Sequence, residues 1–308
     1  MKVPTISIKN FPDDPGFVQN LGQAYESCGF CGISDHGISE ATIEDAYAVL
    51  RQFFALPQKV KQQYTTQTAG ARGYTNFGVE TAKDSEHPDL KEFWQVGREV
   101  QGQQPGHEAL IPNVWPREID DFKPKLYRLY EALEALGNQV LDALAIYLEL
   151  PPGYFRDKVN NGNSILRPLH YPPIARQDTL SLRSAPHEDI NLITLLVGSQ
   201  EPGLEVLSRS GEWVPINMPA GAIVVNIGDM MQRLTNHVLP STTHRVVNSA
   251  EAFTGGSRYS IPFFLHPNPD FEIATLPSCI TPDNPNRYPQ PILADVYLKQ
   301  RLVEIGLM

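Results

Sequence analysis

The chain has 308 residues, of which 41% are hydrophobic and 19% are charged, and its formal net charge is −10. This composition is typical of a soluble globular protein with a large core, and it argues against extensive disorder. The negative charge, without a dense run of lysine or arginine, also argues against binding to a phosphate backbone, so no nucleic-acid partner is expected.

Targeting and redox features favour a cytoplasmic protein. The N-terminal sequence lacks the apolar stretch of a signal peptide, and no segment approaches about 18 consecutive apolar residues, so no membrane span is expected. Cys28, Cys31 and Cys279 form a sparse, odd-numbered set, unlike a secreted disulfide framework. The C-G-F-C motif has neither a second cysteine pair for zinc nor a thioredoxin-like context, and we expect two buried thiols.

The N-terminal part is predicted to be helical, with short strands between the helices. Apolar residues recur at helical spacing in two segments, and Ser39 can cap the second helix. The predicted elements are a strand at 4–8, a helix at 15–28, a strand and turn at 29–38, a helix from Glu40, a short helix at 56–64 with Pro57 in its first turn, and loops with short strands at 65–115.

A long helix separates this part from a strand-rich half. Apolar residues follow a 3.6-residue period over 118–148, and P-P-G at 151–153 ends the helix. From about residue 163, short alternating segments recur between turn residues at roughly 8–12-residue spacing, which is typical of a β-sandwich or barrel. The predicted strands lie within 164–171, 190–197, 203–207, 212–216, 222–227, 243–247 and 259–265.

These elements predict a mainly β fold with flanking helices, built on a jelly-roll core. No sharp linker interrupts the chain, so residues 1–308 are predicted to form a single domain. Its parts are an N-terminal helical and loop region at 1–118, a long scaffold helix at 119–153, a jelly-roll core at 163–270 and a C-terminal tail at 271–308.

The segment P-H-E-D-I-N at 186–191 carries the first chemical signal. His187 and Asp189 stand two residues apart before an apolar run, so in a strand they would share a face and point into the barrel. His244, in S-T-T-H-R-V-V, is the best-placed third ligand from a distant strand. Two imidazoles and one carboxylate make the facial triad of non-haem Fe(II) oxygenases, which leaves positions open for a bidentate co-substrate and O₂.

This pattern has an ordinary alternative. An isolated H-x-D pair is more often a solvated or salt-bridged pair, and eight histidines offer several chance partners. R-Y-S at 258–260 adds to the metal hypothesis, because Arg258 and Ser260 share a strand face and a guanidinium beside a hydroxyl can grip a carboxylate. An arginine paired with a surface acid is the alternative for this motif.

Together the motifs resemble a known family. The chain is similar over nearly its full length to the isopenicillin N synthase-like branch of the Fe(II)/2-oxoglutarate-dependent dioxygenases. The shared motifs stand in the family's order and at its approximate spacing. They are V-P-T-I-S-I near the start, C-G-F-C-G-I-S-D-H-G-I at 28–38, F-F-A-L-P-Q-K-V-K at 53–61, H-Y-P-P at 170–173, H-E-D at 187–189, G-D-M-M-Q-R-L-T-N-H at 228–237, H-R-V at 244–246 and R-Y-S at 258–260.

The resemblance implies an oxygenase domain built on a double-stranded β-helix of the cupin type. Its metal would be Fe(II), with 2-oxoglutarate and O₂ as co-substrates. Decarboxylation of 2-oxoglutarate to succinate and CO₂ would accompany oxidation, expected to be hydroxylation, of a small organic substrate. The residues that it assigns are His187, Asp189 and His244 as metal ligands, and Arg258, Ser260 and Tyr171 as contacts of 2-oxoglutarate.

Other positions are expected to be structural or tolerated. Tyr171 has the alternative of packing in the barrel mouth as an ordinary strand tyrosine. Asn226 and Asp229 are interpreted as turn residues, and His36, in a turn that resembles the family's Asn-His-Gly, as a structural residue. Glu188 stands where the family commonly has threonine and is expected to point away from the metal.

Three alternatives to this function stay open. Some enzymes of the branch keep the R-x-S pair without using 2-oxoglutarate, and bind another carboxylate or bicarbonate there. A non-catalytic jelly-roll metal-binding module is the second, and a zinc hydrolase, for which no general base is predicted, is the third.

The substrate is predicted only as a small molecule, anionic if Arg72 faces the pocket, and the oligomeric state is not predicted. Candidate pocket residues are Arg72, Tyr74, Phe93, Gln95 and Phe264.

Overall fold

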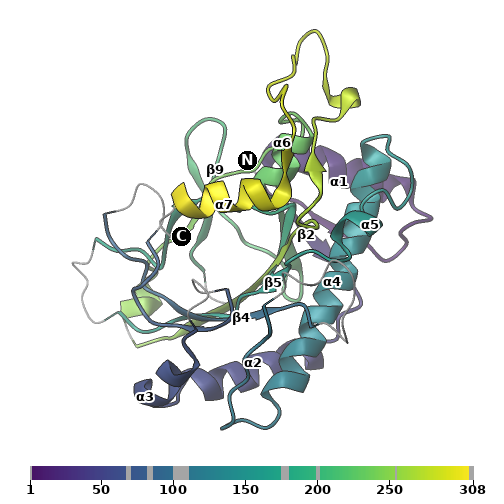
Figure 1. Ribbon diagram of the computed structural model, residues 1–308. Helices are drawn as coiled ribbons and strands as arrows, with labels where there is room; N and C mark the ends of the chain where they lie inside the picture. The colour runs from purple at the N-terminus through teal and green to yellow at the C-terminus, as the bar shows by residue number, and fades with distance from the viewer. Residues whose placement is uncertain are drawn as a thin grey trace.

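The computed structural model describes residues 2–66, 71–81, 86–99, 111–174, 180–198, 202–253 and 255–304. Two β-sheets form the centre of the described fold, and helices pack around them (Figure 1). The predicted mainly β fold with flanking helices is therefore confirmed. Part of the predicted loop region at 65–115 falls outside the described residues.

Local capping signals set the N-terminal helices. Asp14 caps α1 (Pro15–Cys28) and Ser39 caps α2 (Glu40–Phe54), each side chain accepting a backbone N–H of the first turn. Both helices are confirmed, whereas Pro57 precedes α3 rather than lying in its first turn. The remaining elements before the long helix are β1 (Thr5–Ser7), β2 (Phe30–Ser34), α3 (Gln58–Lys61), a 3₁₀ turn (Gln62–Tyr64), β3 (Gly73–Thr75) and β4 (Glu92–Gly97).

The strand-rich half follows the long helix α4 (Phe122–Tyr147) and the short helix α5 (Arg156–Val159). Each segment predicted as a strand contains one, and the structure adds β7 (Ser184–His187), which the hydrophobic pattern did not indicate. The other strands are β5 (Ile165–Leu166), β6 (Leu169–Tyr171), β8 (Ile193–Val197), β9 (Leu204–Leu207), β10 (Trp213–Pro215), β11 (Ile223–Ile227), β12 (His244–Val246) and β13 (Arg258–Leu265).

The strands form two sheets that supply opposite walls of one cavity. The larger sheet has nine strands in the order β1-β2-β11-β8-β13-β5-β4-β3, with β6 paired to β13 and β4. The smaller sheet has four strands in the order β10-β9-β12-β7. Residues of both sheets line the same cavity, as expected for a jelly roll.

Helices cover the outer face of the larger sheet. α4 packs against β8 and β13, and it also contacts α1 and α2, which lie beside it (Figure 1). Gly137 permits this close packing, because a Cβ at this position would meet Leu265 Cδ1 at 2.5 Å. The apolar face of α4 that the 3.6-residue period predicted is buried, including Leu126, Leu133 and Leu144.

The C-terminal segment predicted as a tail contains regular structure. β14 (Glu272–Ile273) and β15 (Ile292–Leu293) form a small ribbon, and α7 (Ala294–Glu304) follows. Figure 1 places α7 on the opposite side of the sheets from α2. A short helix, α6 (Asp229–Leu234), links β11 to β12. Two 3₁₀ turns, Ala250–Phe253 and Pro277–Cys279, complete the elements. No helix in the described segments is long and apolar enough to cross a membrane.

A buried ionic network joins the N-terminal helices to the larger sheet. Lys61 Nζ, after α2, lies 2.8 Å from Glu92 Oε2 on β4, and both side chains are less than a tenth exposed. The Glu92 carboxylate also pairs with His170 Nδ1 at 2.7 Å and accepts a hydrogen bond from the Tyr74 hydroxyl. Burial would raise the pKa of Glu92, but these partners hold it below its usual range, so the carboxylate stays ionised.

We expect Glu92→Gln to destabilise the protein by about 3–5 kcal/mol, because it leaves the Lys61 ammonium buried without a counter-charge. Chemical denaturation measures the change. The double variant Lys61→Met/Glu92→Gln should recover most of the loss, since it removes both charges. Glu44→Gln is the control, because its ion pair with Arg51 is about half exposed and should contribute less than about 1 kcal/mol. Equal losses in Glu92→Gln and Glu44→Gln would contradict the prediction.

Candidate metal centre and cavity

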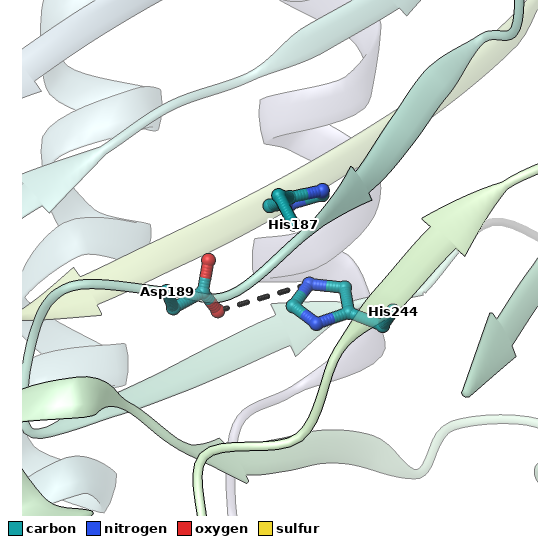
Figure 2. Close-up of side chains that lie close together, drawn as sticks. All are labelled: His187, Asp189 and His244. Carbon is teal, nitrogen blue, oxygen red and sulfur yellow. Dashed lines mark ion pairs between the residues drawn. The ribbon is translucent and has the colours of Figure 1, made fainter. Parts of the chain in front are cut away.

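Strand pairing brings two histidines and one aspartate together. His187 ends β7 and His244 begins β12, and the two residues are direct partners in the antiparallel register. Asp189 lies in the turn between β7 and β8. One ligand atom from each side chain lies within 4.8 Å of the others, and His244 Nε2 lies 3.9 Å from Asp189 Oδ2 (Figure 2). The expectation that His187 and Asp189 share a strand was wrong, but the turn still directs the carboxylate at both imidazoles.

Backbone carbonyls fix the orientation of both imidazoles. His187 Nδ1 donates to the Ala185 carbonyl at 2.8 Å, and His244 Nδ1 donates to the Thr242 carbonyl at 3.1 Å. These bonds leave Nε2 of each ring as the lone-pair atom available to a metal.

Two polar residues hold the Asp189 carboxylate. Thr194 Oγ1 donates to Asp189 Oδ2 at 2.6 Å, and Asn226 Nδ2 donates to the same oxygen at 2.8 Å. The interpretation of Asn226 as a turn residue was wrong, because it lies within β11 and is buried. Asp229 begins α6, and its N–H donates to the Asp189 carbonyl at 2.7 Å. A polar residue inside each apolar run, L-I-T-L-L and V-V-N-I, was the available signal for Thr194 and Asn226.

The protonation states suit a metal site. Burial, followed by the neighbouring His244, lowers the pKa of His187 to about 4, so this ring is neutral near pH 7. Burial would raise the pKa of Asp189, but the two imidazoles and the hydrogen bonds from Asn226 and Thr194 lower it overall. Two imidazole nitrogens and one carboxylate are the donor set of non-haem Fe(II) sites, so the residues present fit that metal.

A second polar cluster faces the same cavity from β13. Arg258 is 3% exposed, and its Nη1 donates to Ser260 Oγ at 3.4 Å. Tyr171 is its cross-strand partner, with the Arg258 Cζ 5.1 Å from the ring centroid. Arg258 Nε is buried without a hydrogen-bond partner, and no carboxylate pairs with Arg258 among the residues that the structure describes. A buried guanidinium without a counter-charge fits an anionic ligand.

The cavity has a volume of about 780 Å³ and contains both clusters. It is lined from both sheets and from α7, which contributes Leu298 and Leu302. Glu188, which lines the cavity, is exposed and accepts a hydrogen bond from Thr243. His36 bonds to the Gly221 carbonyl, in keeping with a structural role.

The five candidate pocket residues fall into two groups. Gln95 and Phe264 line the cavity, whereas Arg72, Tyr74 and Phe93 are not among its lining residues. The Arg72 guanidinium bonds to the Ile111 and Ala71 carbonyls and to Asn163, and Tyr74 belongs to the Glu92 network. The condition for an anionic substrate, that Arg72 faces the pocket, is therefore not met. Apart from the Ala71 carbonyl, these partners of Arg72 and Tyr74 are at least 18 residues away in sequence, so the sequence pattern did not indicate these contacts.

Comparison with known proteins places this geometry in a family. The profile described as the 2OG-Fe(II) oxygenase superfamily matches residues 162–267, and the N-terminal profile named for a non-haem dioxygenase in morphine synthesis matches residues 3–118. The 2-oxoglutarate-Fe(II) type oxidoreductase hxnY of Emericella nidulans is 32% identical over 290 residues, which cover 91% of this chain and 82% of hxnY. Proline hydroxylase buaE of Petromyces alliaceus is 33% identical, covering 99% of each chain.

Solved structures agree with these matches. A protein assigned to the 2OG-Fe(II) oxygenase family of Caulobacter crescentus is 49% identical, with a TM-score of 0.91, and the match covers 98% of this chain and 99% of that one. A full-length Neurospora crassa protein, solved with alpha-KG (2-oxoglutarate) and also with alpha-KG and thymine, is 29% identical, with a TM-score of 0.85 and coverage of 98% and 96%.

The matches extend over the whole fold and include its metal centre. The protein is accordingly an oxidoreductase that uses Fe(II), 2-oxoglutarate and O₂ to oxidise a small organic substrate. The chain belongs to the 2OG-Fe(II) oxygenase superfamily.

Proposed function

We propose that two separate sets of residues in the cavity of this dioxygenase bind Fe(II) and 2-oxoglutarate. The observation that carries the proposal is that a buried cluster of two imidazoles and one carboxylate lines the same cavity as a buried guanidinium without a carboxylate partner among the described residues. The proposed residues are His187, Asp189 and His244 for Fe(II), and Arg258, Ser260 and Tyr171 for 2-oxoglutarate.

The side chains orient the reactants and keep water out. Bound Fe(II), with 2-oxoglutarate and O₂, supplies the oxidation of a substrate C–H bond as 2-oxoglutarate loses CO₂ to give succinate. Arg258 neutralises the distal carboxylate of 2-oxoglutarate, and its planar fork fixes the direction of that carboxylate. Thr194 and Asn226 restrain Asp189 in the position that a metal ligand needs. Apolar residues around the cavity limit the access of water.

We also propose that hydroxylation is the outcome and that the substrate is a small polar compound. Two relatives support this: one is a proline hydroxylase, and the Neurospora crassa protein has been solved with thymine. A small molecule, rather than nucleic acid or a membrane, is the proposed partner, in keeping with the net charge of −10.

A cytoplasmic location is the corresponding proposal for the compartment. Cys28, Cys31 and Cys279 are all buried free thiols, as expected where thiols stay reduced.

Two measurements test the proposed function. Anaerobic addition of Fe(II) and 2-oxoglutarate should give a weak visible charge-transfer band, and aerobic turnover should release one succinate for each O₂ consumed. Consumption of O₂ without succinate would favour a 2-oxoglutarate-independent oxidase. Absence of both the band and O₂ consumption would favour a non-catalytic metal-binding module.

Arg258→Ala should weaken 2-oxoglutarate binding by about 30- to 150-fold, because charged hydrogen bonds to a carboxylate contribute about 2–3 kcal/mol. Titration of the anaerobic Fe(II) protein measures this dissociation constant. Arg258→Lys should weaken 2-oxoglutarate binding less than Arg258→Ala, since lysine keeps the positive charge but lacks the planar guanidinium. Arg156→Ala is the control, because this arginine is 73% exposed. An unchanged affinity in Arg258→Ala would exclude its proposed role.

Thr194→Val and Asn226→Leu should each lower Fe(II) affinity by about tenfold or more, because hydrogen bonds to a ligating carboxylate fix its orientation. Anaerobic calorimetric titration with Fe(II) gives the dissociation constants. Thr275→Val, at a half-buried threonine outside the cavity, is the matched control. If all three variants bind Fe(II) like the unmodified protein, the assignment of Asp189 as a positioned ligand is wrong.

The metal-free protein should become less stable as the pH falls below about 6.5. Burial lowers the pKa of His187 and of His266 to about 4, so between pH 4 and 6.5 the unfolded chain binds more protons than the folded one. Each imidazole should reduce the free energy of unfolding by up to about 1.4 kcal/mol per pH unit in this range. Urea denaturation at pH 5 and pH 7 measures the change. Between pH 7 and pH 5, the free energy of unfolding should fall less in His266→Asn than in the unmodified protein. In His87→Asn, at an exposed site, it should fall as much as in the unmodified protein.

A further inference from the structure

An arginine in the cavity wall makes fewer hydrogen bonds than its donors allow. Arg167 follows β5, and its guanidinium lies over the rings of Phe93 and Phe264, with Cζ 4.9 Å and 5.2 Å from the two centroids. Its terminal nitrogens make two long contacts, 3.3 Å to Glu80 Oε1 and 3.4 Å to Gln95 Oε1, and its Nε has no partner among the residues that the structure describes. The aromatic rings therefore fix the plane of a cation that has N–H groups left for a ligand.

The surroundings of Arg167 already balance its charge. Glu80 pairs with Arg167 and with Lys91, which lies 3.1 Å away, and Lys91 also pairs with Asp89 at 2.8 Å. Burial would raise the pKa of Glu80, but Lys91 and Arg167 lower it to about 2, so the carboxylate is ionised near pH 7. Two cations and two anions give this wall no net formal charge.

A second polar side chain with unused hydrogen-bonding capacity lies in the same part of the cavity wall. His266 is 9% exposed and lines the cavity, and its imidazole makes no hydrogen bond to the described residues. Burial, with a further contribution from Arg167, lowers the pKa of His266 to about 4, so the ring is neutral and offers one donor and one acceptor. A buried imidazole that lacks partners in the protein is costly unless a ligand or water supplies them.

The position of these groups separates them from the 2-oxoglutarate clamp. Arg258, Ser260, Phe264 and His266 all line the cavity from alternate positions along β13 and its continuation. Arg258 is at the beginning of the strand, whereas His266 follows its end. The Arg167 N–H donates to the Pro262 carbonyl, which sets Arg167 beside the far half of the strand.

We propose that Arg167 and His266 bind the polar end of the oxidised substrate, and that this substrate is a compact neutral molecule bearing an amide-type carbonyl. The proposal rests on the proposed function and specifies its substrate class. Arg167 donates to the carbonyl oxygen, and His266 bonds to the adjacent N–H or to the same carbonyl. A carboxylate would add an uncompensated charge to a buried wall that is already neutral, whereas a carbonyl accepts the same hydrogen bonds without that penalty. Phe264 presents an apolar surface beside them.

Pairs of neutral and acidic compounds of the same size test the substrate class. Benzamide and benzoate, cyclohexanecarboxamide and cyclohexanecarboxylate, and thymine and orotate are titrated into the anaerobic Fe(II) and 2-oxoglutarate complex by calorimetry. We expect the neutral member of the tightest-binding pair to bind at least fivefold more tightly than its acid. Tighter or equal binding of the acid overturns the proposal, and so does the absence of measurable binding by every neutral compound.

Variants then test the two residues with the tightest neutral compound. Arg167→Gln and His266→Phe should each raise its dissociation constant at least fivefold, and a smaller change in either variant overturns the proposal. If Arg167→Gln does not fold, the double variant Arg167→Gln/Glu80→Gln, which keeps this part of the cavity wall neutral, takes its place. Arg156→Gln and His87→Asn make similar changes at exposed sites outside the cavity and should leave the dissociation constant unchanged.

The unmodified enzyme separates this proposal from the function on which it rests. Its charge-transfer band with 2-oxoglutarate and its release of succinate depend on the metal centre and the clamp, and their absence refutes the proposed function. When both are present, the compound pairs and the two variants decide the substrate class alone.

Discussion

The direct pairing of His187 with His244 is the constraint on which the site depends. β7 and β12 belong to the smaller sheet, and their antiparallel register sets two imidazoles side by side, with ring centroids 4.3 Å apart. Two such rings would repel each other if both were protonated, and burial makes protonation of His187 still less favourable. The nearby Asp189 carboxylate offsets this tendency, but it must be held in place. The larger sheet provides the restraint through Thr194 on β8 and Asn226 on β11, so the centre requires both sheets.

The cavity holds its charges in two different ways. Around Arg167, cations and anions alternate at short distances, and the pKa of Glu80 is far below its usual range. Around Arg258, by contrast, the guanidinium is buried with one long contact to Ser260 and no acid among the described residues. A folded protein keeps such an uncompensated charge only where the surrounding packing supports it, and the resulting field attracts an anion. This contrast distinguishes the part of the cavity wall proposed to bind an anionic co-substrate, around Arg258, from the part around Arg167, where the charges are already balanced.

Much of the fold could be predicted because its signals are local. Caps at Asp14 and Ser39, and the period of α4, depend on residues close together in sequence, and the predicted ligands stood out as polar residues before or within apolar runs. Contacts made across the sheets could not be predicted in this way. Arg72 was expected in the pocket, but its guanidinium is held by the carbonyl of the adjacent Ala71 and by two groups distant in sequence, the Ile111 carbonyl and Asn163. Likewise, α7 forms part of the cavity although its segment gave no clear helical pattern, because its packing surface is supplied by the barrel.

The proposed roles of β13 would let one jelly roll keep its co-substrate and vary its substrate. The beginning of the strand carries Arg258 and Ser260, which pair in register with β6 and are buried. Its far half pairs instead with β5 and β8, and there the cavity-facing positions are Pro262, Phe264 and, beyond the strand, His266. Because alternate residues of a strand share a face, substitutions at these later positions would change the proposed substrate wall without moving the proposed 2-oxoglutarate contacts. Under this proposal the two halves of the strand are under different physical constraints: the first neutralises a fixed carboxylate, and the second complements whichever molecule is oxidised.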